Sequence, residues 1–175
     1  SHKLCLLDAR MPSPTRLTVD LNALAANFHA LEAAAGVPVH PVVKADSYGL
    51  GAVACARRLM AEGARTFFVA RAVEGIALRE ALGPHPTIYV LDGCVGETAP
   101  ALKAAELRPV LNHGAQLAAW RAADAGPCAV QVDTGMNRLG FRPEEAPEPF
   151  DGLTMVLSHL ACADDPSAEM NARQR

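Results

Sequence analysis

The chain has 175 residues, of which 50% are hydrophobic and 20% are charged, and its formal net charge is −3. This length and apolar content suit one domain with a sizeable core, and they exclude an intrinsically disordered chain. Basic residues are not in excess, no apolar run approaches the roughly 20 residues of a membrane span, and the five cysteines lack the paired spacing of a zinc site. We therefore expect a cytoplasmic protein with reduced thiols and no metal, which binds neither nucleic acid nor membrane.

The first ten residues are set apart from the rest of the chain. They precede a Met-Pro pair, at positions 11 and 12, that looks like a native start. Their apolar stretch is too short for a signal peptide. We therefore interpret residues 1–10 as a tag remnant or N-terminal extension, and residues 11–175 as the folded part.

Helices and strands are predicted to alternate along residues 11–175. Asp20 can cap a first helix, and Gly36 lies just past its end. Short apolar strands are predicted at residues 37–43, 66–70, 87–91, 107–111, 128–133 and 153–159. Residues 45–51 are expected to be a loop, and helices are predicted at residues 52–62, 73–82, 98–105 and 114–125, with a last one opening at 165–166.

This alternation is typical of parallel βα units. A full (β/α)8 barrel needs eight strands and about 250 residues. About six βα units are predicted here, and that number fits either a doubly wound open sheet or a barrel cut short.

Three polar side chains lie at or just past the predicted carboxyl ends of different strands: Lys44, Arg138 and His159. Active sites of parallel α/β folds assemble at that end. Lysine can form a Schiff base with an aldehyde cofactor, arginine offers a planar fork to a carboxylate or phosphate, and histidine can transfer protons. Each residue taken singly is more often structural or solvated, but their convergence on one rim favours an active site.

A glycine-containing segment follows Lys44. Tyr48, Gly49 and Gly51 precede a predicted helix, which is a suitable place for a phosphate. With Ala54 the segment also matches a dinucleotide fingerprint, which would indicate a nicotinamide-dependent oxidoreductase. Four residues separate Lys44 from Gly49, whereas the first fingerprint glycine follows its strand almost at once, so we rank this alternative lower.

Three segments resemble the signatures of bacterial alanine racemases. The sequence VVKADSYGLG at residues 42–51 resembles their pyridoxal-phosphate lysine motif. VDTGMNRLG at residues 132–140 resembles a second signature, and SHLACAD at residues 158–164 resembles a third. With LTVDL at residues 17–21, which fits the family's start, the resemblance covers the chain from about residue 17 to its end.

The resemblance implies a role for each matching residue. Lys44 would hold pyridoxal 5'-phosphate as a Schiff base and act as one of two bases at the substrate Cα. Tyr48 would bind the cofactor phosphate, and Leu91 would line the cofactor. Arg138 would contact the cofactor's phenolic oxygen and the substrate carboxylate, and His159 would pack against the pyridine ring.

The resemblance also implies a fold and an activity. The fold would be a parallel (β/α)8 TIM-type barrel, incomplete in this chain, with residues 11–175 forming the N-terminal part of the cofactor-binding barrel domain. The activity would be that of an isomerase, racemising L-alanine and D-alanine for peptidoglycan synthesis. The protein would be a cytoplasmic homodimer with a shared active site.

The sequence departs from the family pattern at two points. At Gln131 many members carry a carbamylated lysine, and Gln131 would offer Arg138 a neutral acceptor instead. The family's second base, a tyrosine from a β-domain of the partner subunit, matches neither Tyr48 nor Tyr89, so we expect this chain alone to be inactive. The alternative is a single-domain pyridoxal-phosphate carrier of the same barrel fold, although such proteins lack the signature at residues 133–138.

Overall fold

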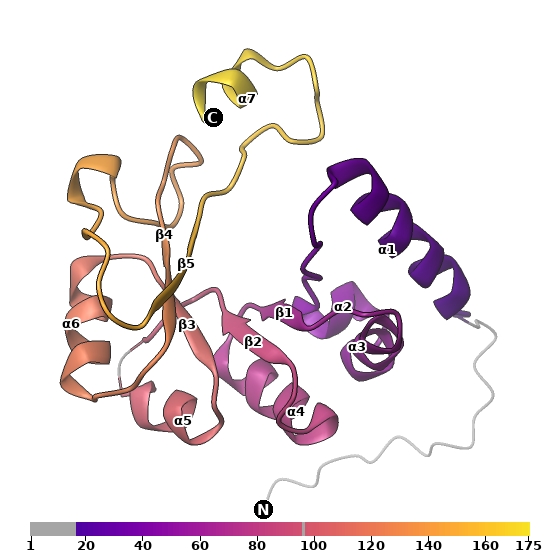
Figure 1. Ribbon diagram of the computed structural model, residues 1–175, viewed down its shortest axis with the longest axis horizontal. Helices are drawn as coiled ribbons and strands as arrows, with labels where there is room; N and C mark the ends of the chain where they lie inside the picture. The colour runs from indigo at the N-terminus through magenta and orange to yellow at the C-terminus, as the bar shows by residue number, and fades with distance from the viewer. Residues whose placement is uncertain (1–16, 96) are drawn as a thin grey trace, which may run out of the picture.

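Five parallel strands form the centre of the structure (Figure 1). The structure is a computed structural model, and it describes residues 17–95 and 97–175. The strands are β1 (Thr66–Val69), β2 (Thr87–Val90), β3 (Arg108–Leu111), β4 (Cys128–Gln131) and β5 (Leu153–Leu157). Each strand pairs in parallel with the next in the order β1-β2-β3-β4-β5. A doubly wound sheet reverses its strand order part-way, whereas a TIM-type barrel keeps sequential strands adjacent. The order confirms the barrel-type fold, which the described strands do not close.

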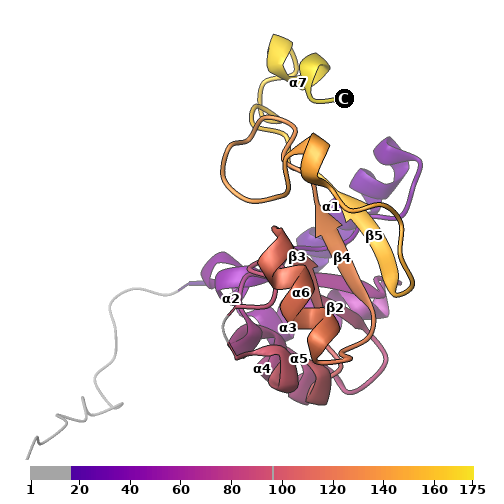
Figure 2. The same ribbon diagram turned by 90° about the vertical axis from the view of Figure 1, so that its left-hand side faces the viewer.

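The helices are α1 (Leu21–Ala35), α2 (Lys44–Gly49), α3 (Ala52–Ala61), α4 (Ala72–Leu82), α5 (Ala99–Ala104), α6 (Gly114–Ala122), the 3-10 turn η1 (Pro143–Glu145) and α7 (Glu169–Arg173). From β1 to β4 single helices alternate with the strands, and α3, α4, α5 and α6 lie along one side of the sheet, whereas α7 lies apart from it (Figures 1 and 2). Asp20 caps α1 as predicted, because its Oδ1 accepts the N–H groups of Asn22 and Ala23 at 2.8 and 3.1 Å. Gly36, with a φ of 66°, ends this helix as predicted.

Successive side chains along each strand point to opposite faces of the sheet. On the outer face, strand residues such as Phe67, Ile88 and Val130 pack against the helices in the main core. On the inner face, a second cluster contains Phe68, Tyr89, Val110 and Ala129, with Leu91, Met155 and Leu157 packed against it. The inner face leads to the carboxyl ends of the strands, where the site residues were predicted.

The strand predicted at residues 37–43 is wrong. Only an isolated bridge between Val42 and Phe68 forms there. The N–H of Val43 donates to the carbonyl of Phe68 at 2.8 Å, and the N–H of Phe68 donates to the carbonyl of Pro41 at 2.9 Å. Pro38 and Pro41 have no N–H to donate, so a ladder cannot extend through them. Five strands therefore form within residues 17–95 and 97–175, where six were predicted.

The last helix also begins later than expected. Asp165 accepts the N–H of Ser167 at 2.9 Å in a turn, and α7 starts at Glu169. The predicted extension at residues 1–10 lies outside the described residues.

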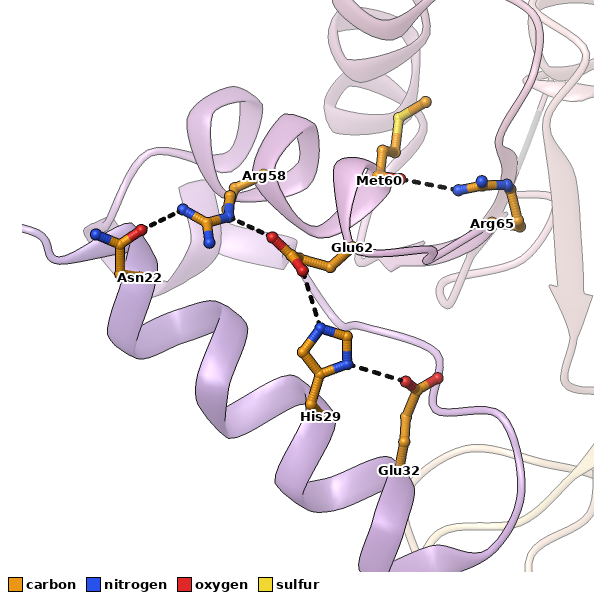
Figure 3. A network of polar contacts seen from close by, with 7 residues as sticks. All are labelled: Asn22, His29, Glu32, Arg58, Met60, Glu62 and Arg65. Atoms are coloured by element: carbon orange, nitrogen blue, oxygen red, sulfur yellow. Dashed lines mark hydrogen bonds and ion pairs between the residues drawn. The ribbon is translucent and has the colours of Figure 1, made fainter.

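A polar network joins α1 to the end of α3 (Figure 3). His29 Nε2 lies 2.9 Å from Glu62 Oε2, and Arg58 Nε donates to the other oxygen of Glu62 at 2.9 Å. Arg58 Nη1 also donates to Asn22 Oδ1 at 2.6 Å, and His29 Nδ1 lies 3.6 Å from Glu32. Polar contacts therefore fix α1 beside α3 in addition to apolar packing.

None of the helices in the described part of the chain has both the length and the apolar composition that a membrane crossing requires.

Four cysteines in that part are free thiols: Cys55, Cys94, Cys128 and Cys162. Burial raises the pKa of the Cys128 thiol to about 11, which keeps it neutral.

Candidate active site

A cavity of about 430 Å³ opens at the carboxyl ends of the strands. All five predicted site residues line it: Lys44, Tyr48, Leu91, Arg138 and His159. This volume lies within the range of roughly 300–1,000 Å³ that is common for small-molecule sites. The structure therefore brings together residues that are separated by more than a hundred positions in the sequence.

Lys44 begins α2, whose backbone turns in the left-handed sense. Residues 45–48 all have positive φ, between 51° and 55°, and none of them is glycine. Left-handed helical backbone costs a non-glycine residue about 1–2 kcal/mol, so this turn persists only because its surroundings hold it. The loop predicted at residues 45–51 is thus an ordered turn, and it separates Lys44 from Gly49, which is unlike the dinucleotide fingerprint.

Hydrogen bonds hold both ends of this turn. The N–H of Ser47 donates to the carbonyl of Val43 at 3.0 Å. The carboxylate of Asp46 accepts the N–H of Ala52 at 2.6 Å, which ties the turn to the start of α3. The turn presents Lys44 and Tyr48 to one cavity, with Lys44 Nζ 5.9 Å from the centre of the Tyr48 ring.

Arg138 lies on a loop that follows β4 and begins at Asp133. Asp133 Oδ1 accepts the N–H groups of Gly135 and Asn137 at 2.9 and 3.0 Å. These hydrogen bonds hold the pKa of the Asp133 carboxyl below its ordinary value. The loop is therefore ordered by its first residue, and its exposed arginine reaches the cavity.

The loop returns close to the strand that it leaves. The N–H of Phe141 donates to the carbonyl of Gln131, and the N–H of Asp133 donates to the carbonyl of Phe141, both at 2.8 Å. Gly140 has a φ of 121°, and a Cβ there would lie 2.7 Å from the nitrogen of Asp133. Only glycine fits this closure.

Gln131 is buried at the end of β4 and lines the cavity. Its Nε2 donates to the main-chain carbonyl of Leu139 at 2.8 Å, next to Arg138. The amide thus supports the backbone of the loop. The predicted contact in which Gln131 accepts from the Arg138 guanidinium stays a prediction.

His159 follows β5 by two residues and shares the cavity with two cations. Partial burial lowers the pKa of His159 below its ordinary 6.5, and the positive charges of Arg138 and Lys44 lower it further. The imidazole is therefore mainly neutral at neutral pH.

Apolar side chains of the inner sheet face complete the cavity. Phe68 and Leu157 line it together with Leu91. The sequence analysis missed Phe68 and Leu157, although strand alternation could have found them, since they share the inward positions of their strands. Asn112 donates to the carbonyl of Leu91 at 3.0 Å and so supports the turn after β2.

A second cavity, of about 400 Å³, lies at the opposite ends of the strands and is lined by Arg79, Lys103 and Arg108. Arg79 donates to main-chain carbonyls of Gly83, Pro86, Ala105 and Glu106. Burial lowers the pKa of this arginine. The N–H groups of the Arg79 guanidinium are therefore used in hydrogen bonds that hold the surrounding backbone.

Comparison with known proteins agrees with this geometry. The family described as "Alanine racemase, N-terminal domain" matches residues 19–175. A protein named "Alanine racemase, catabolic" from Mesorhizobium japonicum is 50% identical over 173 residues, covering 91% of this chain and 45% of the relative. An alanine racemase from Dinoroseobacter shibae is 47% identical over 166 residues, covering 90% of this chain and 48% of the relative.

A solved structure is similar as well. The alanine racemase from Bartonella henselae with covalently bound pyridoxal phosphate superimposes with a TM-score of 0.82 at 32% identity, covering 89% of this chain and 49% of that one. The fold and the comparisons define an α/β chain with the TIM-barrel-like architecture of a racemase. The chain belongs to the alanine racemase N-terminal domain family, and it spans about half the length of the curated relatives that it matches.

Proposed function

We propose that this chain carries the pyridoxal-phosphate site of an alanine racemase, an isomerase that interconverts L-alanine and D-alanine. The observation that supports the proposal most directly is the position of Lys44. It begins an ordered turn at the carboxyl end of the sheet and shares one cavity with Arg138 and His159. The Bartonella henselae relative, which holds pyridoxal phosphate covalently, supports the same assignment.

The chemistry of the cavity fits such a cofactor. It offers a primary amine from Lys44, a phenol from Tyr48 and a guanidinium from Arg138. The amine suits a covalent bond to an aldehyde, and the phenol and guanidinium suit anionic oxygens. The apolar wall and the neutral imidazole of His159 suit a flat aromatic ring.

Each residue has a proposed part in binding. Lys44 Nζ would hold the cofactor through its aldehyde group, because a primary amine can bond covalently to an aldehyde. Tyr48 would donate its hydroxyl hydrogen to the phosphate, and Leu91 would pack against the ring. Arg138 would hold the phenolic oxygen and the substrate carboxylate, while His159 would pack against the pyridine ring.

Racemisation requires proton transfer on two faces of the substrate Cα. The cofactor, when bound, withdraws electrons from Cα and so makes its proton acidic. Lys44 Nζ would take or return the proton on one face. Tyr89 is a poor candidate for the other face, because it is buried and its hydroxyl lies 2.9 Å from Thr154 Oγ1.

The second base is therefore proposed to be a tyrosine of a partner subunit in a homodimer with a shared active site, as the family resemblance implies. On this account the 175-residue chain binds the cofactor but does not invert alanine by itself. The use implied for the whole protein is the supply of D-alanine for peptidoglycan in the cytoplasm.

Peptide mapping after borohydride reduction tests the site. The chain has three lysines, Lys3, Lys44 and Lys103, which makes the label unambiguous. The chain is incubated with pyridoxal phosphate, reduced and digested, and the label is expected on Lys44. Lys44→Ala should remove the main label, and Lys103→Ala serves as the matched control. A label that is no stronger on Lys44 than on the other two lysines would refute the assignment.

Proton exchange in heavy water tests the chemistry. With cofactor and L-alanine, the chain should exchange the Cα proton slowly without forming D-alanine, and Lys44→Ala should abolish the exchange. Efficient inversion by the chain alone would contradict the two-base account. Cofactor labelling without any Cα exchange would favour the alternative of a pyridoxal-phosphate carrier.

A further inference from the structure

The turn that follows Lys44 needs external support, because residues 45–48 hold a conformation that non-glycine residues rarely adopt. The direction of the Lys44 side chain depends on this backbone. A group that forms a hydrogen bond to the backbone of the turn next to Lys44 therefore influences where the lysine amine lies in the cavity.

Glu74, a residue of α4, forms such a hydrogen bond. It lies in the first turn of α4, and its Oε1 accepts the N–H of Ala45 at 2.8 Å. Its Oε2 accepts the N–H groups of Ala70 and Arg71 at 2.8 and 3.0 Å. One carboxylate thus joins the end of β1, the start of α4 and the residue directly after Lys44.

The two carboxylate oxygens of Glu74 accept hydrogen bonds from different segments of the chain. The contact of Oε2 with the N–H of Arg71, the N-cap residue of α4, is a local contact of a kind common at the start of a helix. The contact of Oε1 crosses 29 positions in the sequence and is not needed to begin the helix. Ala70, which Oε2 fixes, lines the same cavity as Lys44. The carboxylate therefore sets the distance between the Lys44 turn and the cavity wall.

We propose that Glu74 is a positioning residue for Lys44, and this inference rests on the proposed function. Glu74 holds the backbone N–H of Ala45 and so directs the Lys44 amine into the cavity. A capping role alone would leave the reactivity of Lys44 unchanged when the Ala45 contact is lost.

Glu74→Gln separates the two roles. An amide keeps the length of the side chain but has only one oxygen, and its NH2 group cannot accept a hydrogen bond. The oxygen is expected to face the two N–H groups of Ala70 and Arg71, which leaves the contact with Ala45 broken. Glu74→Asp is a second variant, because a shorter carboxylate keeps its charge near the start of α4 but does not reach Ala45. Glu80→Gln, at an exposed position of the same helix, is the matched control.

Two readouts are measured on the 175-residue chain. The first is amide hydrogen exchange of a peptide covering residues 44–51, without any cofactor. The second is the ratio of borohydride-trapped pyridoxyl label on Lys44 to that on Lys103, which reports ordinary amine reactivity within the same molecule. Glu74→Gln and Glu74→Asp should each speed exchange in residues 44–51 and lower the label ratio, each by about tenfold, the factor that corresponds to about 1.4 kcal/mol. Glu80→Gln should change neither.

The outcomes separate the inference from the function on which it rests. If the parent chain shows no preference for Lys44, the proposed function fails, and the exchange rates still decide whether Glu74 holds the turn. If the parent prefers Lys44 and both Glu74 variants keep the parental ratio, the positioning role is wrong. Global unfolding of a variant would be visible as fast exchange in β2 and β3, and the other variant then decides.

Discussion

Gln174, in the last turn of the described chain, donates a hydrogen bond from Nε2 to the main-chain carbonyl of His159 at 3.0 Å. Its Oε1 accepts the N–H of Ala161 at 2.8 Å, and its Nε2 also lies 3.2 Å from Thr134 Oγ1. One buried amide thus connects the segment after β5, which carries His159, to the loop after β4, which carries Arg138.

Replacement of this amide should loosen both segments. Gln174→Leu keeps most of the volume but removes the donor and the acceptor, so we expect the free energy of unfolding to fall by about 1–3 kcal/mol. Urea unfolding measures the loss, and faster hydrogen exchange in residues 158–164 locates it. Arg173→Gln, which breaks only an exposed ion pair with Glu169, should cost less than about 1 kcal/mol. Equal effects of the two changes would show that the Gln174 amide does not support this region.

Replacement of Arg138 should affect turnover far more than folding. Arg138 is exposed, so Arg138→Lys should leave the unfolding midpoint almost unchanged. Lysine keeps the charge but loses the planar fork, and a charged hydrogen bond formed mainly in the transition state is worth about 2–4 kcal/mol, or roughly 30- to 1000-fold in rate. The measurement is kcat/KM for alanine, in both directions, in the proposed full-length racemase rather than in the 175-residue chain alone. Arg142→Lys on the same loop is the control, and parental rates in Arg138→Lys would exclude a role in holding the carboxylate.

The charge around His159 should be visible without any cofactor. An NMR titration of the His159 ring should give a pKa below 6.5, since burial and the cations Arg138 and Lys44 all disfavour the charged ring. Arg138→Gln and Lys44→Gln should each raise this pKa, and neither should restore it fully, because burial is the largest cause. Arg142→Gln should leave it unchanged. If removing either cavity cation does not move the titration, the three residues do not share one electrostatic environment.

Part of this architecture could be predicted from the sequence, and the reasons are local. The periodicity and the caps at Asp20 and Gly36 predicted α1, and short apolar runs bounded by glycine and proline predicted the five strands. Lys44, Arg138 and His159 could be grouped because the carboxyl ends of parallel strands meet at one edge. This argument needs only the order of the elements.

Other features depend on contacts between distant residues. The left-handed turn at residues 45–48 contains no glycine, so composition gave no signal for it. Its support by Glu74 comes from another helix, and no periodicity reports such a contact. Residues 37–43 have the apolar composition of a strand, but their two prolines limit the pairing with β1 to a single bridge. The missing N–H groups of the prolines, rather than the hydrophobicity of the segment, therefore explain why no strand forms there.

The contact between His29 and Glu62 should make the docking of α1 on α3 depend on pH. The hydrogen bond to Glu62 raises the pKa of His29 above 6.5, and the hydrogen bonds from His29 and Arg58 lower the pKa of Glu62 below 4.5 (Figure 3). The contribution of His29 is complete below its unfolded pKa of 6.5 and is lost as the pH rises through its raised folded pKa. The contribution of Glu62 is complete above its unfolded pKa of 4.5 and is lost as the pH falls through its lowered folded pKa.

The two linkages together predict a window of greatest stabilisation between about pH 4.5 and 6.5, where both groups are charged. The difference in unfolding free energy between the parent and His29→Gln should be largest in this window and should shrink on either side. The His29 side chain is exposed and that of Glu62 is partly exposed, so salt should reduce the difference as well. His85→Gln controls for the loss of a surface imidazole. A parent-to-variant difference that is flat from pH 4 to 8, or that grows above pH 7, would mean that the His29–Glu62 pair does not couple protonation to the docking of α1.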